Sequence, residues 1–397
     1  MKAPLGWTHT TFDKHVDCLT GFAFKSSDYS SDEKDVRLLR GDNIEPGNLR
    51  WKDAKFWPDT ELDSFERYRL QEGDFVIALD RTWISSGLKV AEVTPADLPC
   101  LLVQRVARVR ANSTLEQSLL RQYFSGHRFE QYVKSVQTAT AVPHISPNDI
   151  KEFPVALPPL SEQKKITKIL STWDKAITTT EQLLANSQQQ KKALMQQLLT
   201  GKKRLLDKNG VRFSGEWKRV ELGDLLDYRQ PTPYLVESTN YSDAFSTPVL
   251  TAGKTFILGY TNEDSGIFAE NLPVIIFDDF TTDSKFVEFP FKAKSSAMKI
   301  LTARHGVSIR YVYEAMQLLD FAVGGHQRHW ISIYSRLVVP FPEKDEQKKI
   351  AEVLSTADSE ITNLQQKLDA LKQEKKALMQ QLLTGKRRVK VDDQEVA

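Results

Sequence analysis

Residues 162–204 read EQKKITKILSTWDKAITTTEQLLANSQQQKKALMQQLLTGKKR, and residues 346–388 read EQKKIAEVLSTADSEITNLQQKLDALKQEKKALMQQLLTGKRR. The two stretches align without a gap, and 27 of the 43 paired residues are identical. The segments that precede them, roughly 1–156 and 207–340, show no such likeness. The repeated segments are therefore expected to bind one kind of partner at two sites, and each of the two unlike segments is expected to bind a different ligand.

Each repeated stretch has the pattern of a long helix that packs against another helix. In the second copy, apolar residues recur in steps of three and four from Ile350 to Leu382. This spacing forms a heptad seam, which is typical of a coiled coil. The first copy keeps the same register from Ile166 to Leu198, with more polar residues in the seam. We therefore predict two long helices that pair with each other.

The ends of both helices carry matching signals. Ser161 and Asp345 occupy equivalent positions where an N-cap is expected, and prolines precede both. Gly201 and Gly385 follow the last apolar residues, where a left-handed glycine commonly ends a helix. About 40 residues at ~1.5 Å each give a helix roughly 60 Å long.

Chain order predicts how such helices run. The first helix leads away from the first domain and delivers the chain to the second domain. The second helix must return if it pairs with the first, so the pair is expected to be antiparallel. The two domains should then lie at opposite ends, related by a pseudo-twofold axis.

Several outward-facing residues are also identical in the two copies. They are Lys164, Lys165, Gln196, Gln197 and Lys202. Packing between the helices does not require this identity, so it favours a docking surface that one kind of partner uses twice. The alternative is a recent duplication whose copies have not yet diverged.

Composition excludes several classes of protein. The 397 residues carry a formal net charge of only +2, so any surface that binds nucleic acid must be local. Two cysteines give neither a disulfide framework nor a zinc spacing, which fits a reducing cytosol. No apolar run is long enough for a membrane-spanning helix. The sequence predicts a cytoplasmic protein.

The two unlike domains have mixed α/β signals, with loops rich in Gly, Ser, Thr, Asn and Asp. Faint traces of duplication remain at their starts, where Trp7 aligns with Trp217. We predict an α/β (α+β) architecture of two loop-rich domains separated by the paired helices. The expected strands are 75–79 and 101–109 in the first domain and 274–277, 285–289 and 330–334 in the second, with helices near 115–132 and 312–319.

The order of these parts resembles the specificity (S) subunit of type I restriction-modification systems. The resemblance covers essentially the whole chain. Its most specific motifs are LPPLSEQKKI at 157–166, FPEKDEQKKI at 341–350 and the LLTG that ends each helix. RGDNI at 40–44 and TPVLTAGKT at 247–255 also resemble the target-recognition domains of that family.

The resemblance implies a division of the chain. Target-recognition domains are expected at 1–156 and 207–340, spacer and docking helices at 157–206 and 341–389, and a polar tail at 390–397. Each recognition domain would read one half of a split, asymmetric site in double-stranded DNA. Two methyltransferase (M) subunits would dock on the helices, and two restriction (R) motor-nuclease subunits can join them.

By the same resemblance, this chain holds no cofactor and performs no catalysis. The methyltransferase partners would use S-adenosylmethionine, and a restriction subunit would add ATP with Mg²⁺.

Reading DNA requires Arg, Lys, Asn, Gln, Ser or Thr on loops that enter the major groove. The Gly324–His329 segment, GGHQRH, is the strongest candidate, because it gathers an amide and three basic or titratable groups beside two glycines. A polar surface loop without a ligand is the alternative. The full set of candidates is Arg40, Asn43, Arg81 and Lys89 in the first domain and Thr251, Lys254, Thr255, Ser296, His326, Gln327, Arg328 and His329 in the second.

Other functions have weaker support. A coiled-coil structural adaptor whose end domains bind proteins is the main alternative. Residues 252–255, AGKT, resemble the end of a P-loop, but Pro248 stands where another glycine is needed. His326 and His329 have no third ligand nearby, so no metal is predicted. The sequence also lacks a glycine-rich methyl-donor motif, so an enzyme is not expected.

Overall fold

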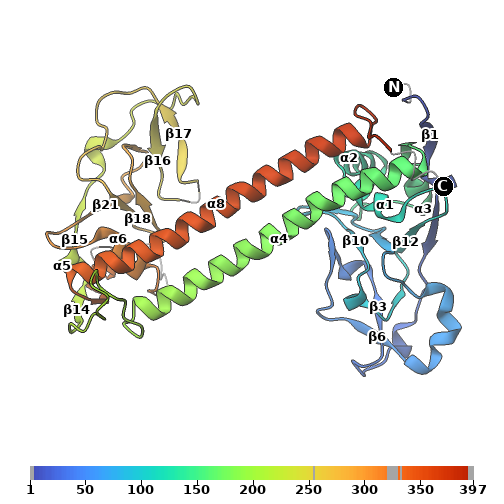
Figure 1. The fold of residues 1–397 in the computed structure, drawn as a ribbon, viewed down its shortest axis with the longest axis horizontal. Helices are drawn as coiled ribbons and strands as arrows, with labels where there is room; N and C mark the ends of the chain where they lie inside the picture. Colours follow the sequence, from blue (N-terminus) through green and yellow to red (C-terminus); the bar gives the residue numbers. More distant parts are fainter. Residues whose placement is uncertain (1–3, 254, 320–329, 331–332, 392–397) are drawn as a thin grey trace. The chain divides into compact units, whose positions relative to one another are not determined.

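The computed structural model describes residues 4–253, 255–319, 330 and 333–391. The chain forms two compact units, Met1–Thr180 with Lys367–Ala397, and Glu181–Gln366. Each unit contains a loop-rich α/β domain and parts of two long helices (Figure 1). The predicted fold class is therefore confirmed.

The first unit is built around a four-stranded antiparallel sheet. Its elements are β1 (Thr8–Thr11), β2 (Val16–Thr20), β3 (Val36–Leu39), β4 (Ile44–Glu45), β5 (Asn48–Leu49), β6 (Lys55–Trp57), β7 (Phe75–Ala78), β8 (Trp83–Ile84), β9 (Gly87–Leu88), β10 (Val90–Glu92), β11 (Cys100–Leu102), β12 (Val106–Ala111), α1 (Gln117–Phe124), α2 (His127–Val136), α3 (Pro147–Lys151) and β13 (Pro154–Leu157). The main sheet has the order β10-β7-β12-β2. A second sheet, β11-β3-β6, pairs β11 parallel to β3, and β1 pairs with β13.

The second unit repeats this topology. Its elements are β14 (Lys218–Glu221), α5 (Leu222–Leu225), β15 (Leu226–Arg229), β16 (Thr247–Leu250), β17 (Ile257–Thr261), β18 (Val274–Asp278), β19 (Ser284–Val287), β20 (Lys292–Ala293), β21 (Met298–Ala303), α6 (Ile309–Met316) and β22 (Val338–Phe341). The main sheet is β15-β21-β18-β19, a smaller sheet is β17-β16-β20 with β20 parallel to β16, and β14 pairs with β22. Two domains with no evident sequence likeness thus share one fold.

Three predicted elements differ from the structure. The strand expected at 101–109 is two strands, because the polar turn at Gln104 and Arg105 interrupts it, with Arg105 in a left-handed conformation (φ 68°). The helix expected at 115–132 is divided before His127 into α1 and α2. The strand expected at 330–334 is wrong. Trp330 is buried against the Phe277 ring, and Tyr334 begins a 3-10 turn.

The long helices are α4 (Leu160–Leu198) and α8 (Lys344–Leu382), each of 39 residues. In the first unit, Asp174 of α4 pairs with Lys375 of α8 at 2.5 Å. In the second, the equivalent residues Lys191 and Asp358 pair at 2.6 Å. Within each unit the C-terminal part of one helix therefore lies beside the N-terminal part of the other (Figure 1), as the predicted antiparallel pairing requires.

The predicted signals at the helix ends are only partly correct. Gly201 and Gly385 have positive φ angles of 72° and 68°, as expected for C-terminal glycines. Ser161 and Asp345 are not N-caps, because both helices begin one residue earlier. Each lies in the first helical turn.

A hydrogen-bond cluster around a buried glutamate ties each domain start to a helix. In the first unit the Glu162 carboxylate accepts the Trp7 indole N–H at 3.0 Å and two Arg388 guanidinium N–H groups at 2.7 Å each. Glu162 is buried. We call these three residues the first latch.

The second unit contains the same cluster. Glu346 accepts the Trp217 indole N–H at 2.9 Å and the Arg204 guanidinium N–H groups at 2.6 and 2.7 Å. The repeated glutamate of EQKKI and the arginine that closes each repeat are therefore explained by contacts within the chain. We call Trp217, Glu346 and Arg204 the second latch.

The long helices also contribute to both domain cores. Ile166 and Leu170 of α4 and Leu382 of α8 belong to the apolar cluster of the first unit. Leu198 and Leu354 belong to the corresponding cluster of the second. Each domain is thus fixed to its helix ends by apolar packing and by a latch.

Candidate nucleic-acid interface

Three loops of the first domain are held together by backbone hydrogen bonds. They follow β3, follow β7 and join β11 to β12. The Val103 N–H donates to the Leu39 carbonyl at 3.1 Å, and the Leu79 N–H donates to the Arg105 carbonyl at 2.9 Å. These bonds fix the loops at one edge of the two sheets.

The loops surround a polar hollow of about 360 Å³. Three residues predicted from the sequence, Arg40, Arg81 and Lys89, line it together. Gln104 and Arg105 line it as well, and both residues are exposed. The hollow therefore gathers guanidinium, ammonium and amide groups, which are the groups that contact phosphates and base edges in DNA.

Two arginines of this hollow have left-handed backbones. Arg81 has φ 47° and Arg105 has φ 68°. This conformation is uncommon outside glycine and persists only where surrounding bonds enforce it. The Arg81 N–H donates to the Pro143 carbonyl at 2.7 Å, and the Arg105 carbonyl accepts from Leu79. Both arginines are held by fixed backbone on loops that leave their side chains exposed.

Acidic neighbours orient the cations without cancelling them. Asp42 pairs with Arg40 at 2.8 Å. Asp80 pairs with Arg105 at 3.0 Å and lies 2.6 Å from the His144 ring nitrogen. Burial lowers the pKa of Lys89, which the nearby Asp42 carboxylate partly opposes. The four cations outnumber the two carboxylates of this hollow.

Asn43, also a predicted contact, makes hydrogen bonds within its own loop. Asn43 is buried. Its side-chain oxygen accepts the Arg40 backbone N–H at 3.0 Å, and its side-chain NH₂ group donates to the Arg50 carbonyl at 3.0 Å. These bonds shape the loop that carries Arg40.

The second domain holds its equivalent loops by equivalent bonds. The Lys294 N–H donates to the Leu250 carbonyl at 2.9 Å, and the Asp279 N–H donates to the Ala297 carbonyl at 3.3 Å. The predicted residue Ser296 is exposed on the loop that joins β20 to β21. Ser296 therefore lies on the loop that is equivalent to the Gln104 loop of the first domain.

The loop between β16 and β17 carries further predicted residues. The Thr251 hydroxyl donates to the Thr255 carbonyl at 2.6 Å, which closes a tight turn. Thr255 itself is exposed. Thr251 therefore shapes the turn, while Thr255 is open to a ligand.

Five predicted residues lie outside the described residues. They are Lys254, His326, Gln327, Arg328 and His329.

Sequence reasoning missed several loop residues. Gln104 and Arg105 lie inside the strand predicted at 101–109, although a polar pair within the apolar run LLVQRVARV is a signal for a turn. In the second domain, Phe280 exposes 43% of its surface on the loop after β18, and Lys294 lies above the Tyr241 ring at 5.8 Å. An exposed aromatic ring and a cation on these loops add stacking and phosphate-binding chemistry.

Within the residues that the structure describes, no group of three His, Cys, Asp or Glu side chains could hold a metal ion. None of the helices in that part of the chain is long and apolar enough to cross a membrane.

Comparison with known families gives two matches along the chain. The family described as "Type I restriction modification DNA specificity domain" matches residues 26–186 and 214–373. Each match includes most of one α/β domain and part of the long helix that follows it; the first match begins after β2.

Curated relatives match shorter stretches. The chain is 48% identical over 174 residues to the Escherichia coli type I restriction enzyme EcoR124I/EcoR124II specificity subunit, covering 43% of this chain and 41% of the relative. It is 38% identical over 184 residues to the EcoAI specificity subunit of the same species, covering 46% and 30%. The matches therefore span less than half the length of either relative.

Solved structures resemble the whole chain. The S subunit of a type I restriction-modification system from M. genitalium has a TM-score of 0.64 at 12% identity, covering 96% of this chain and 98% of that one. A chain from a structure on complex assembly and conformational transition of the type I R-M system has a TM-score of 0.52 at 16% identity, covering 98% and 100%. At such identities the likeness concerns the fold.

Proposed function

Because the chain belongs to the type I restriction-modification DNA specificity family, we propose that each of its two domains reads one half of a bipartite, asymmetric DNA site. The observation that carries the proposal is the loop cluster common to both domains. Equivalent backbone bonds hold it, but Arg81, Gln104 and Arg105 occupy it in the first domain, and Phe280 and Ser296 occupy it in the second. One scaffold with different side chains suits two different base sequences.

In the first domain, Arg81 and Arg105 are the base readers of this proposal. A guanidinium can donate two hydrogen bonds to the O6 and N7 of guanine in the major groove. Lys89 and Arg40, which line the same hollow, are suited to nearby phosphates. The first half-site should therefore contain guanine.

In the second domain, Thr255 and Ser296 have short hydroxyl side chains that can bond to several bases. Lys254 and the residues from His326 to His329 remain predicted contacts of this half-site.

The proposed complex contains two methyltransferase subunits on the helices, with restriction subunits as possible additions. The repeated surface residues Gln196 and Gln380, together with Lys192 and Lys376, support a site that occurs once in each copy. The chain itself would bind no cofactor. The partners would bring S-adenosylmethionine, and ATP with Mg²⁺ where restriction subunits join.

The test measures DNA binding by the chain with its methyltransferase subunit while salt is varied. Neutralised phosphates release counterions, so affinity for the specific site should fall steeply as salt rises. A complex of two methyltransferase subunits per chain that binds two separated half-sites would support the proposal. A complex without measurable DNA binding at low salt would favour a structural adaptor whose domains bind proteins.

A further inference from the structure

A second cavity of about 470 Å³ lies in the first unit, between the α1–α2 corner and the last turns of α8. Its apolar lining includes four buried residues, Tyr123, Phe153, Met379 and Leu383. Ligand pockets of proteins commonly have volumes in the range of roughly 300–1,000 Å³ and are mostly apolar. The cavity is distinct from the polar hollow, with which it shares no lining residue.

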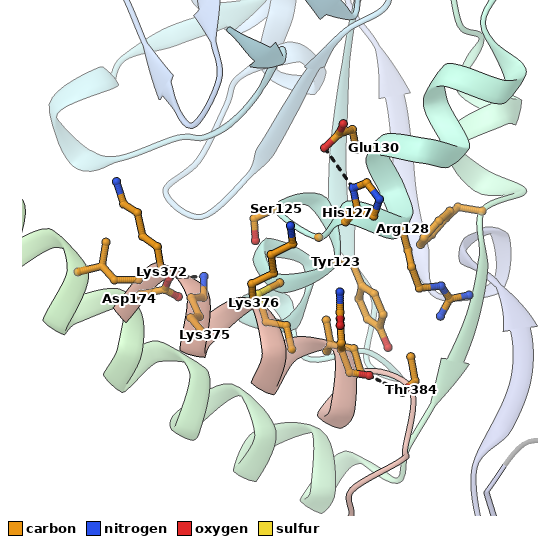
Figure 2. A pocket seen from close by; sticks show the side chains of 16 residues that line it. Tyr123, Ser125, His127, Arg128, Glu130, Asp174, Lys372, Lys375, Lys376 and Thr384 are labelled. Atoms are coloured by element: carbon orange, nitrogen blue, oxygen red, sulfur yellow. Dashed lines mark hydrogen bonds and ion pairs between the residues drawn. The ribbon is translucent and has the colours of Figure 1, made fainter. Parts of the chain in front are cut away.

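Cations stand around the apolar lining. Figure 2 shows Lys372 and Lys376 extending from α8 and Arg128 approaching from α2. The carboxylates of the lining are engaged with other groups, since Asp174 pairs with Lys375 at 2.5 Å and Glu130 pairs with Lys134 at 2.7 Å. The mouth of the cavity therefore favours an anionic ligand.

The chemistry favours a protein segment over nucleic acid. A DNA backbone has no apolar group that would cover the Met379 and Leu383 side chains. An apolar side chain flanked by Asp or Glu satisfies both parts of the cavity. Methionine also adapts its shape to different apolar ligands.

The wall on α8 is one of the most strictly repeated parts of the sequence. Lys376, Met379, Gln380 and Leu383 all lie within KKALMQQLLTGK at 375–386, and the same twelve letters occur at 191–202. The opposite wall comes from the first domain, whose sequence is not repeated. A ligand of the repeated wall is expected to be common to both halves of the chain, unlike a DNA half-site.

We propose that this cavity is a socket for an acidic segment of the methyltransferase subunit that inserts an apolar side chain. The inference rests on the proposed function for the identity of the partner. The segment's carboxylates pair with Arg128 and Lys376, and its apolar side chain fills the space beside Met379 and Tyr123.

The test uses the full-length chain and its methyltransferase subunit, with affinity measured by surface plasmon resonance. Two variants disable the socket in different ways. Arg128→Glu combined with Lys376→Glu reverses charge at exposed residues, and Ser125→Trp plugs the mouth without changing charge. Each should weaken association by at least about tenfold, because the partner loses ion pairs or space. Circular dichroism and thermal unfolding verify that the variants fold.

The matched control is Lys367→Glu, an exposed residue of α8 outside the cavity lining. It should change the affinity by less than about twofold, as isolated surface charges usually do. Equal losses in the control and the charge-reversal variant, or no loss with Ser125→Trp, would overturn the socket. A comparable loss of DNA binding by the charge-reversal variant, measured without the methyltransferase subunit, would also overturn the socket, because it would indicate a phosphate site.

The failure of the proposed function gives a different result. If the methyltransferase subunit does not associate with the unaltered chain, the complex itself is wrong and the socket fails with it. If it associates equally with the unaltered chain and both socket variants, only the socket is overturned.

Discussion

At the scale of single residues, Arg81 and Arg105 are the most informative. Both have left-handed backbones, and both line the same hollow from different loops. Strained conformations of this kind cost about 1–3 kcal/mol and are commonly kept at functional sites. The left-handed backbones, the exposure and the shared hollow are the reasons for proposing these two arginines as readers of the first half-site.

Replacing Arg81 and Arg105 with Ala should weaken recognition of one half-site only. Each good contact to a base is worth roughly 1–3 kcal/mol, so the double variant should lose about thirtyfold or more in affinity. Binding is measured on DNA in which each half-site is scrambled in turn. Arg50→Ala is the control, since Arg50 pairs with Glu45 at 3.0 Å outside the hollow. Equal loss for both half-sites would count against the assignment.

Glu162 and Glu346 give a second prediction at this scale. Glu346→Gln removes the charged acceptor of Arg204 and Trp217 in a buried site, so stability should fall by about 1–3 kcal/mol. Glu162→Gln should act similarly in the first latch. Urea unfolding followed by fluorescence reports the change. The control is Glu352→Gln at an exposed ion pair, and a control that costs as much as Glu346→Gln would refute the latch.

The latches also mark a limit of sequence reasoning. The repeat made Glu162 and Arg388 visible as conserved between copies, but 226 positions separate them in the chain. A repeat on its own does not distinguish a residue kept for internal contacts from one kept for a partner. The pairing of the helix-end arginines Arg204 and Arg388 with buried glutamates was not predicted for this reason.

At the scale of secondary structure, the long helices were predicted well and the domains less well. A heptad seam repeats over many helical turns, so the pattern remains recognisable when one seam position, such as Lys375, is polar. The strands are short and pair with partners far along the chain, as β3 does with β11. The strand predicted at 101–109 is divided into β11 and β12, because the apolar run continues through a turn.

The helices give a prediction about the spacing of the DNA half-sites. Insertion of one heptad after Thr180 and another after Gln366, where the two units divide, preserves the seam and lengthens each helix. Seven residues add about 10 Å, which is the length of roughly three base pairs at 3.4 Å each. The preferred spacer should grow by about that amount.

Affinity for the longer spacer should be lower than normal. Three more base pairs also rotate the second half-site by roughly 100° around the DNA axis, given about 10.5 base pairs per turn. Selection of bound sequences from a library of random spacers measures both effects. An unchanged spacer preference would mean that the helices do not set the distance.

At the scale of the whole molecule, the main finding is one architecture used twice with different loops. The sheets have the same order, and equivalent bonds hold the loop clusters and the latches. In the sequence the likeness left only faint traces, such as Trp7 and Trp217, because side chains on loops and sheet surfaces diverge while backbone pairing persists. The direction in which the helices pair followed from chain order alone.

Methylation mapping tests most directly whether the two unlike loop clusters read two different half-sites. It is done in cells that express this chain with its methyltransferase subunit. Single-molecule sequencing reports the modified bases, both half-sites and the spacer together. We expect two different specified sequences separated by a gap of unspecified bases, with guanine in the half-site that Arg81 and Arg105 read. A single continuous palindrome, or two identical half-sites, would contradict the account.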